Sequence, residues 1–144
     1  MKIHIKKIHK QAVLPEYATE HAAGMDLVAA IDSSVEIKSL ERVVIPSGIA
    51  IALPEGYEAQ VRARSGLSLK HGITAANGVG TIDADFRGEV GVILVNMSNE
   101  VFTITPGMRI AQLVISKYEK VQWQEVDSLD NTERGEGGYG STGH

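Results

Sequence analysis

The chain has 144 residues, of which 43% are hydrophobic, and it carries a formal net charge of -4 and no cysteine. This much apolar material suits one domain with its own core. Without cysteine, disulfides and thiolate metal sites are excluded, and the acidic balance argues against a broad nucleic-acid-binding surface.

The N-terminal stretch MKIHIKKIHK is rich in lysine and lacks the apolar segment of a secretory signal. No apolar run reaches the roughly 18 residues that a membrane span requires. We therefore expect a cytoplasmic protein that binds neither a membrane nor nucleic acid.

Short runs rich in β-branched residues, several of them alternating, predict strands and indicate an all-β sandwich or barrel. The runs lie at 2–8, 33–39, 42–54, 57–64, 88–98, 101–107 and 109–126. One short helix is predicted over 65–72, with Ser65 as a plausible N-cap and Gly72 as the stop. Beyond Val126 the sequence has few apolar groups, so we expect a domain over 1–126 and a mobile arm over 127–144.

The stretch VRARSGLSLKHG joins Arg64 to Ser65 and Gly66 at the start of the predicted helix. Free backbone N–H groups and the helix dipole favour a phosphate there. A capped helix beside a solvated arginine explains the same residues, so spacing alone leaves both open.

The stretch NGVGTIDADFRGEVG places Asp83 and Asp85 on either side of one small residue. This pattern suits a tight hairpin with Asx turns and no further role. Alternatively, an aspartate at such a turn can hold a water as general base, and Gly78 and Gly80 leave the strand backbone open to a flat ligand.

Five segments resemble, in order and spacing, the five motifs of the trimeric dUTP diphosphatases, the dUTPases. They are AAGMDL (22–27), RARSGL (62–67), NGVGTIDADFRGE (77–89), RIAQLVI (109–115) and RGEGGYGSTG (134–143). The resemblance implies an all-β, jelly-roll-like β-barrel of the β-clip type with one short helix. It further implies a homotrimer whose sites combine motifs from neighbouring subunits.

The activity that the resemblance implies is hydrolysis of dUTP to dUMP and pyrophosphate, which keeps uracil out of DNA and supplies dUMP for dTTP synthesis. Asp83 matches the residue that activates the water and contacts the 3′-hydroxyl. Mg²⁺ is expected to be held mainly by the substrate phosphates and by water. Asp26 is the candidate for a contact to the metal through water, although an ion pair with an arginine is comparably plausible.

The phosphate contacts of the family match Arg64, Ser65, Gly66 and Gln112. The serine and the glycine would act partly through backbone N–H groups. For Gln112 a simple bond to a neighbouring strand is the alternative, and Arg109, which starts the same motif, is expected to be structural.

The base-binding hairpin of the family matches residues 77–82, with Asn77 as the direct polar contact and Gly80, Thr81 and Ile82 beside it. Phe86 stands where the family usually has tyrosine, under the deoxyribose. The arm is expected to close over the nucleotide of another subunit. Its contact residues are Arg134 for the terminal phosphate, Tyr139 for stacking on the base, and Gly140, Ser141 and Thr142.

Two alternatives remain at this point. A dCTP deaminase shares the fold and the phosphate site, but TIDADFRGE resembles the hydrolase version of the motif. A homologue that binds nucleotide without cleaving it would not need an aspartate positioned for water. Pyrophosphate release indicates the dUTPase, ammonia release the dCTP deaminase, and binding without turnover the non-cleaving homologue.

Overall fold

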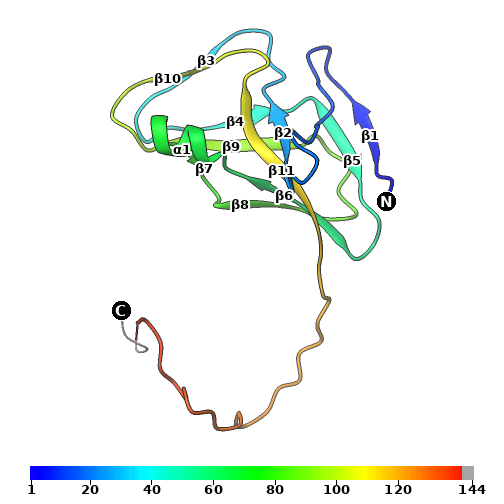
Figure 1. Ribbon diagram of the computed structural model, residues 1–144, viewed down its shortest axis with the longest axis vertical. Coiled ribbons are helices and arrows are strands. Elements are labelled where there is room, and N and C mark those ends of the chain that lie inside the picture. The colour runs from blue at the N-terminus through cyan, green and yellow to red at the C-terminus, as the bar shows by residue number, and fades with distance from the viewer. Residues whose placement is uncertain (141–144) are drawn as a thin grey trace.

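The computed structural model describes residues 1–140, and these form a mostly β protein with one short helix (Figure 1). The strands are β1 (His4–Lys7), β2 (Met25–Val28), β3 (Val35–Ile37), β4 (Arg42–Pro46), β5 (Ile49–Ala52), β6 (Tyr57–Arg62), β7 (Ile73–Ala75), β8 (Val79–Ile82), β9 (Gly91–Asn96), β10 (Phe102–Ile104) and β11 (Arg109–Lys117). The helix α1 spans Ser65–His71. No helix in the described residues has the length and apolar character needed to cross a membrane.

The strands pair antiparallel in four sheets, and the largest has the order β2-β11-β6-β8. The others have the orders β4-β9-β7, β1-β5 and β10-β3. In the largest sheet β11 lies between β2 and β6, with Gln112 opposite both Asp26 and Arg62. The ladders over residues 1–140 do not close into a barrel, so the jelly-roll-like closure stays a prediction.

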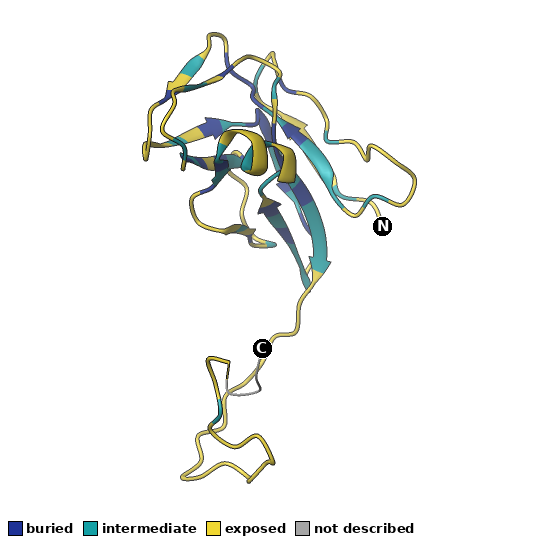
Figure 2. Ribbon diagram, turned by 60° about the vertical axis from the view of Figure 1, so that its left-hand side comes forward, coloured by how far each residue is buried: buried dark blue, intermediate teal, exposed yellow. Residues whose placement is uncertain are grey.

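The core lies between the sheets and is made almost wholly of aliphatic side chains. Alternate residues of a strand point into this core: in β9, Val92 and Leu94 are buried and Ile93 between them is exposed. In Figure 2 many strand residues are buried or intermediate, whereas β1, α1 and the C-terminal arm are largely exposed. The body is therefore held by its sheets, and α1 lies on its surface.

The polar side chain of Asn96, at the end of β9, is fully buried at 0% exposure. Its Nδ2 donates to the carbonyls of Ile37 (2.8 Å) and Glu100 (2.7 Å), and its Oδ1 accepts from N–H (2.9 Å) and Oγ (2.7 Å) of Ser98. These bonds tie the end of β9 to β3 and to the turn that leads to β10. Burial is tolerated because the amide has a partner for each group.

The sequence located the helix correctly but not its cap. Gly72 ends α1 in the left-handed conformation (φ 67°), as predicted. Ser65 as N-cap is wrong, because Arg64 holds that position with extended backbone and no side-chain cap bond. Ser65 is instead the first helical residue.

The strand predictions need three corrections. The run 42–54 is two strands, because Ser47 and Gly48 (φ 72°) turn the chain between β4 and β5. The run 109–126 ends as a strand at Lys117. The short strands β2, β7 and β8 were missed, since three or four residues give too little alternation to be recognised.

The hairpins predicted at 77–82 and around Asp83 and Asp85 do not form, because the strands on either side of each turn do not pair with each other. A tight turn does precede β8, closed by a bond from Gly78 N–H to the Ala75 carbonyl (3.1 Å). However, β8 pairs with β6, whereas both β7 and the next strand, β9, belong to another sheet. Residues 77–89 therefore connect two sheets, and this opens space beside β8.

Replacing Asn96 by alanine is expected to lower the free energy of unfolding by about 2 to 3 kcal/mol, because buried carbonyls and an N–H lose their partners. Urea denaturation followed by circular dichroism measures this. The exposed Asn99 provides the control, since its alanine variant should stay within about 0.5 kcal/mol of the parent. Equal effects of the two variants would contradict a structural role for the buried amide.

Candidate functional site

A basic pocket of about 260 Å³ lies where β2, β11 and the start of α1 meet. We call it the arginine pocket; its lining residues are Ala18, Gly24, Asp26, Arg64, Ser65, Gly66, Arg109 and Gln112. The structure thus brings together residues from three of the sequence motifs. It includes the four candidate phosphate contacts and also Arg109, which the sequence had suggested was structural.

Asp26 fixes both arginines of this pocket. Its Oδ1 lies 3.0 Å from Arg64 Nε, and its Oδ2 lies 3.2 Å from Arg109 Nη1. Arg64 Nη1 also donates to the Arg109 carbonyl at 3.2 Å. Two guanidinium groups around one carboxylate leave a net positive charge, and their planar donors suit phosphate oxygens.

The start of α1 adds backbone donors to the same pocket. Ser65 and Gly66 occupy the first turn, where N–H groups have no acceptor inside the helix. An ideal Cβ on Gly66 would meet no atom within 4 Å, so the backbone here is open to a ligand. The helix is short, and its N–H groups supplement the arginines.

Gln112 is half-buried in the floor of the arginine pocket. Its Nε2 donates to the Ala63 carbonyl at 2.9 Å. Ala63 belongs to the corner between β6 and α1, so the glutamine braces the segment that presents Arg64. This differs from the simple strand-to-strand bond considered from sequence.

The residues of the arginine pocket do not form a metal site by themselves. Among residues 1–140 no group of three or more His, Cys, Asp or Glu side chains comes together. Asp26 is the only carboxylate among the described residues that line the pocket, and each of its oxygens faces an arginine. A divalent cation here would need most of its ligands from a phosphorylated molecule and from water.

A second cavity of about 230 Å³ lies beside β8, and we call it the β8 pocket. The candidate base and sugar residues line it, together with neighbours from β6 and β9: Val61, Asn77, Gly80, Thr81, Ile82, Asp83, Phe86, Glu89, Val90, Gly91 and Ile93. An ideal Cβ on Gly80 would lie 3.2 Å from Val61 Cβ and 3.3 Å from Asn77 Nδ2. A larger residue at position 80 would therefore crowd the amide of Asn77.

Asp83 is exposed at the end of β8, on a turn whose shape is fixed by the backbone. Its carbonyl accepts the Phe86 N–H at 3.2 Å. Arg87 Nη1 donates to the carbonyls of Ala84 (2.6 Å) and Phe86 (2.8 Å). Among residues 1–140 no protein donor pairs with the Asp83 carboxylate, so its oxygens are free to bind water.

The ring of Phe86 forms one wall of the β8 pocket and remains 44% exposed. It packs on Gly88, where an ideal Cβ would lie 2.5 Å from the ring Cζ. Glycine at position 88 is thus required for this ring position. Glu89 anchors the other end of the segment through the Gly48 N–H (2.8 Å).

Within one chain the two pockets are separate and share no lining residue. The arm is also apart from both: after β11 the chain runs away from the body, as Figure 1 shows. Arg134 donates from Nε to the Gly137 carbonyl (2.9 Å), which lies in the arm itself, and Tyr139 is fully exposed. Ser141 and Thr142 lie outside the described residues.

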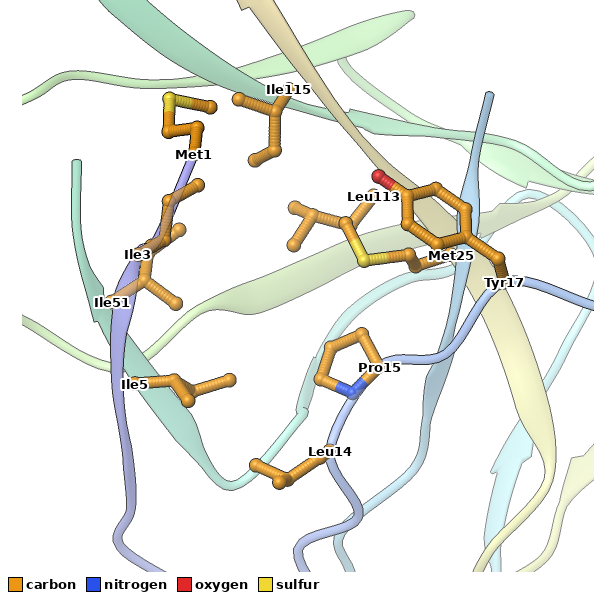
Figure 3. A pocket seen from close by; sticks show the side chains of 10 residues that line it. All are labelled: Met1, Ile3, Ile5, Leu14, Pro15, Tyr17, Met25, Ile51, Leu113 and Ile115. Atoms are coloured by element: carbon orange, nitrogen blue, oxygen red, sulfur yellow. The ribbon is translucent and has the colours of Figure 1, made fainter. Parts of the chain in front are cut away.

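A third cavity, of about 320 Å³, is apolar and does not suit a phosphorylated ligand. Figure 3 shows aliphatic side chains from β1, β5 and β11, with Tyr17 and Met25, around it. None of the described residues that line it has a charged side chain. The chemistry therefore points to the arginine pocket and the β8 pocket.

Together these features define the class of protein: it is a small β protein with two polar pockets that suit a phosphorylated ligand. The family model "dUTPase" matches residues 10–143. The deoxyuridine 5'-triphosphate nucleotidohydrolases of Rickettsia felis and Rickettsia prowazekii are each 59% identical to this chain. They cover 98% and 99% of it, over 96% and 97% of their own lengths.

A solved structure described as Staphylococcus bacteriophage 80alpha dUTPase with dUPNHPP has a TM-score of 0.90 and 29% identity, covering 99% of both chains. The chain therefore belongs to the dUTPase family, and the resemblance seen in the sequence is confirmed.

Besides Arg109, seven residues that line the pockets were not proposed as site residues from sequence: Ala18, Gly24, Val61, Glu89, Val90, Gly91 and Ile93. Gly24 and Glu89 carried a signal, since they belong to the motifs AAGMDL and NGVGTIDADFRGE. The other five are brought to the pockets by strand pairing and by the loops beside the strands, which local sequence does not reveal.

Replacing Arg64 by alanine is expected to weaken binding of inorganic tripolyphosphate about tenfold or more, because a charged bidentate donor is lost. Titration calorimetry without nucleotide measures this. Arg62 is the matched control, since it is exposed, bonds Gln60 (Nε to Oε1, 2.9 Å) and does not line the pocket. Equal losses in the two variants would indicate general charge attraction instead of a defined pocket.

Proposed function

We propose that the protein is a dUTP diphosphatase, which hydrolyses dUTP to dUMP and pyrophosphate. The single observation that carries the proposal is the Asp83 carboxylate, which has no protein donor among residues 1–140 and lies in a pocket lined in part by glycine. The names of the Rickettsia relatives support the substrate, as does the phage structure with dUPNHPP. In a cell this reaction keeps uracil out of DNA and supplies dUMP for dTTP synthesis.

In the proposed reaction Asp83 accepts a proton from a bound water as that water attacks the α-phosphorus. A new P–O bond forms to the water oxygen, and the bond between the α-phosphorus and the bridging oxygen of pyrophosphate breaks. The rigid turn at Phe86 and Arg87 supports this role, because it holds the carboxylate at the pocket edge. A general base of this kind contributes about 10² to 10⁴ in rate.

The β8 pocket accounts for selection of uracil and deoxyribose. Backbone groups of Gly80, Thr81 and Ile82 and the amide of Asn77 offer a fixed pattern of donors and acceptors to a flat base. Such a pattern mismatches the amino group of cytosine, and a close-packed strand leaves no room for the thymine methyl group. The face of Phe86 would pack under the sugar and disfavour a 2′-hydroxyl.

The arginine pocket is assigned to the triphosphate, with Arg64, Ser65, Gly66 and Gln112 as contacts. Mg²⁺ would be held mainly by phosphate oxygens and water, with Asp26 reaching it through a water. The cation supplies charge neutralisation to the triphosphate. Asp26 at the same time keeps Arg64 and Arg109 pointing into the pocket.

We assign the complete site to a homotrimer. The arginine pocket and the β8 pocket are separate within one chain, so a ligand that uses both motifs is best served by two subunits. The arm, from about residue 127, would reach another subunit and close over the nucleotide through Arg134, Tyr139, Gly140, Ser141 and Thr142. Exposed Trp123 and Leu129 support a partner surface along this segment. A cytoplasmic localisation stays a prediction from the sequence.

Replacing Asp83 by asparagine is expected to lower kcat by about 10² to 10⁴ while dUTP binding is retained, because the amide keeps the shape but cannot take the proton. Pyrophosphate release with Mg²⁺ measures the rate. Asp85→Asn is the control, since Asp85 is exposed two residues away and does not line the pocket. A fully active Asp83→Asn enzyme would exclude the general base, and ammonia released from dCTP with dUTP untouched would indicate a deaminase instead.

Ending the chain after Glu133 is expected to leave a folded trimer whose turnover falls about a hundredfold or more, because the lid that orders the phosphates is lost. Gel filtration and thermal unfolding check the fold. Mixing this truncated chain with Asp83→Asn subunits should restore part of the activity, because one chain supplies the carboxylate and the other the arm. Normal turnover by the truncated protein would refute the lid.

A further inference from the structure

We propose that Gly24 is a positioning residue for the phosphate site. Because Gly24 has no side chain, the Gln112 carboxamide can occupy the space beside it, and from there Gln112 holds the corner that carries Arg64. The inference rests on the proposed function only for its kinetic readout. Neither the motif match nor the proposed mechanism gives Gly24 a role.

The space beside Gly24 is occupied by the side chain of another residue. Gly24 directly precedes β2, where Asp26 pairs with Gln112 and Met25 with Leu113. An ideal Cβ on Gly24 would overlap Gln112 Oε1 and would lie 3.3 Å from Gln112 Cδ and 3.4 Å from Gln112 Cβ. The glutamine side chain thus fills the place that a methyl group would take.

Backbone conformation does not explain this glycine. Gly24 is absent from the glycines with positive φ, which include Gly48, Gly72 and Gly78. Alanine can therefore adopt the local backbone without strain. The atoms in the way belong to a flexible side chain, so the expected response to a methyl group is movement of the carboxamide, with the fold kept.

Movement of the Gln112 carboxamide would break its hydrogen bond to the Ala63 carbonyl. Gln112 Nε2 donates to the Ala63 carbonyl at 2.9 Å, between the end of β6 and the start of α1. Arg64 follows directly and is the N-cap of α1. A displaced Gln112 leaves this corner without its brace and also leaves the floor of the arginine pocket.

The segment that begins at Gly24 therefore holds Arg64 in two ways. Asp26 binds its Nε directly at 3.0 Å, and Gly24 acts indirectly through Gln112 and Ala63. Both residues line the arginine pocket with Gln112. The ion pair with Asp26 orients the Arg64 guanidinium, and the bond from Gln112 to Ala63 positions the backbone that carries Arg64.

A double-mutant cycle tests the coupling, with the wild type, Gly24→Ala, Gln112→Ala and the double variant as full-length chains. Each single variant is expected to raise KM for dUTP about tenfold, the effect of one lost hydrogen bond at a charged ligand. For Gly24→Ala we expect kcat within about twofold, because Gly24 acts through Gln112 and does not contact the attacking water. The double variant should match Gln112→Ala alone, since the methyl group then has nothing to displace.

Several outcomes would overturn the proposal: an unchanged KM for Gly24→Ala, or a roughly hundredfold additive increase in the double variant. If Gly24→Ala does not fold, the double variant must fold as Gln112→Ala does, and failure of both would also overturn it. Tripolyphosphate affinity, measured on the same four proteins, carries the same expected pattern without catalysis. An inactive wild type that retains this coupling would therefore sink the proposed function and leave the positioning role standing.

Discussion

The geometry of the arginine pocket depends on one carboxylate placed between two guanidinium groups. Asp26 comes from β2, Arg109 from β11 and Arg64 from the corner before α1, so a single side chain ties three segments together. The Arg64–Asp26 ion pair is only partly exposed, so dissolved salt screens it less than it would screen a pair on the open surface. Since two positive charges surround one negative charge, the cluster remains attractive to an anion while its donors stay fixed.

A second constraint is that the chain separates its two polar pockets. The arginine pocket faces the β2 side of the largest sheet, and the β8 pocket lies at the opposite edge of the same sheet. The arm extends from the body and is away from both (Figure 1). In the proposed trimer this separation is useful, because nucleotide binding can then depend on assembly, and lid closure can exclude water from the reacting phosphate.

Much of the candidate site was accessible from the sequence because the motifs are local. Arg64, Ser65 and Gly66 are consecutive, and residues 77–86 form one continuous segment, so each group could be proposed without knowledge of the fold. The helix stop at Gly72 was equally readable, since few residues tolerate its left-handed backbone. The strands β2, β7 and β8 were not, because a short strand is defined by its partner more than by its own pattern.

The sequence by itself determined the β-rich class, the short helix, the family and the candidate residues, since alternation, turn residues and motif spacing are written along the chain. Only the tertiary structure decided which of these residues meet. It paired Asp26 with two arginines, turned Gln112 toward Ala63, filled the space at Gly24 and divided the site residues between two pockets. The physical reason is that ion pairs and steric contacts form between segments far apart in sequence, and strand register, which local residue preferences do not specify, brings them together.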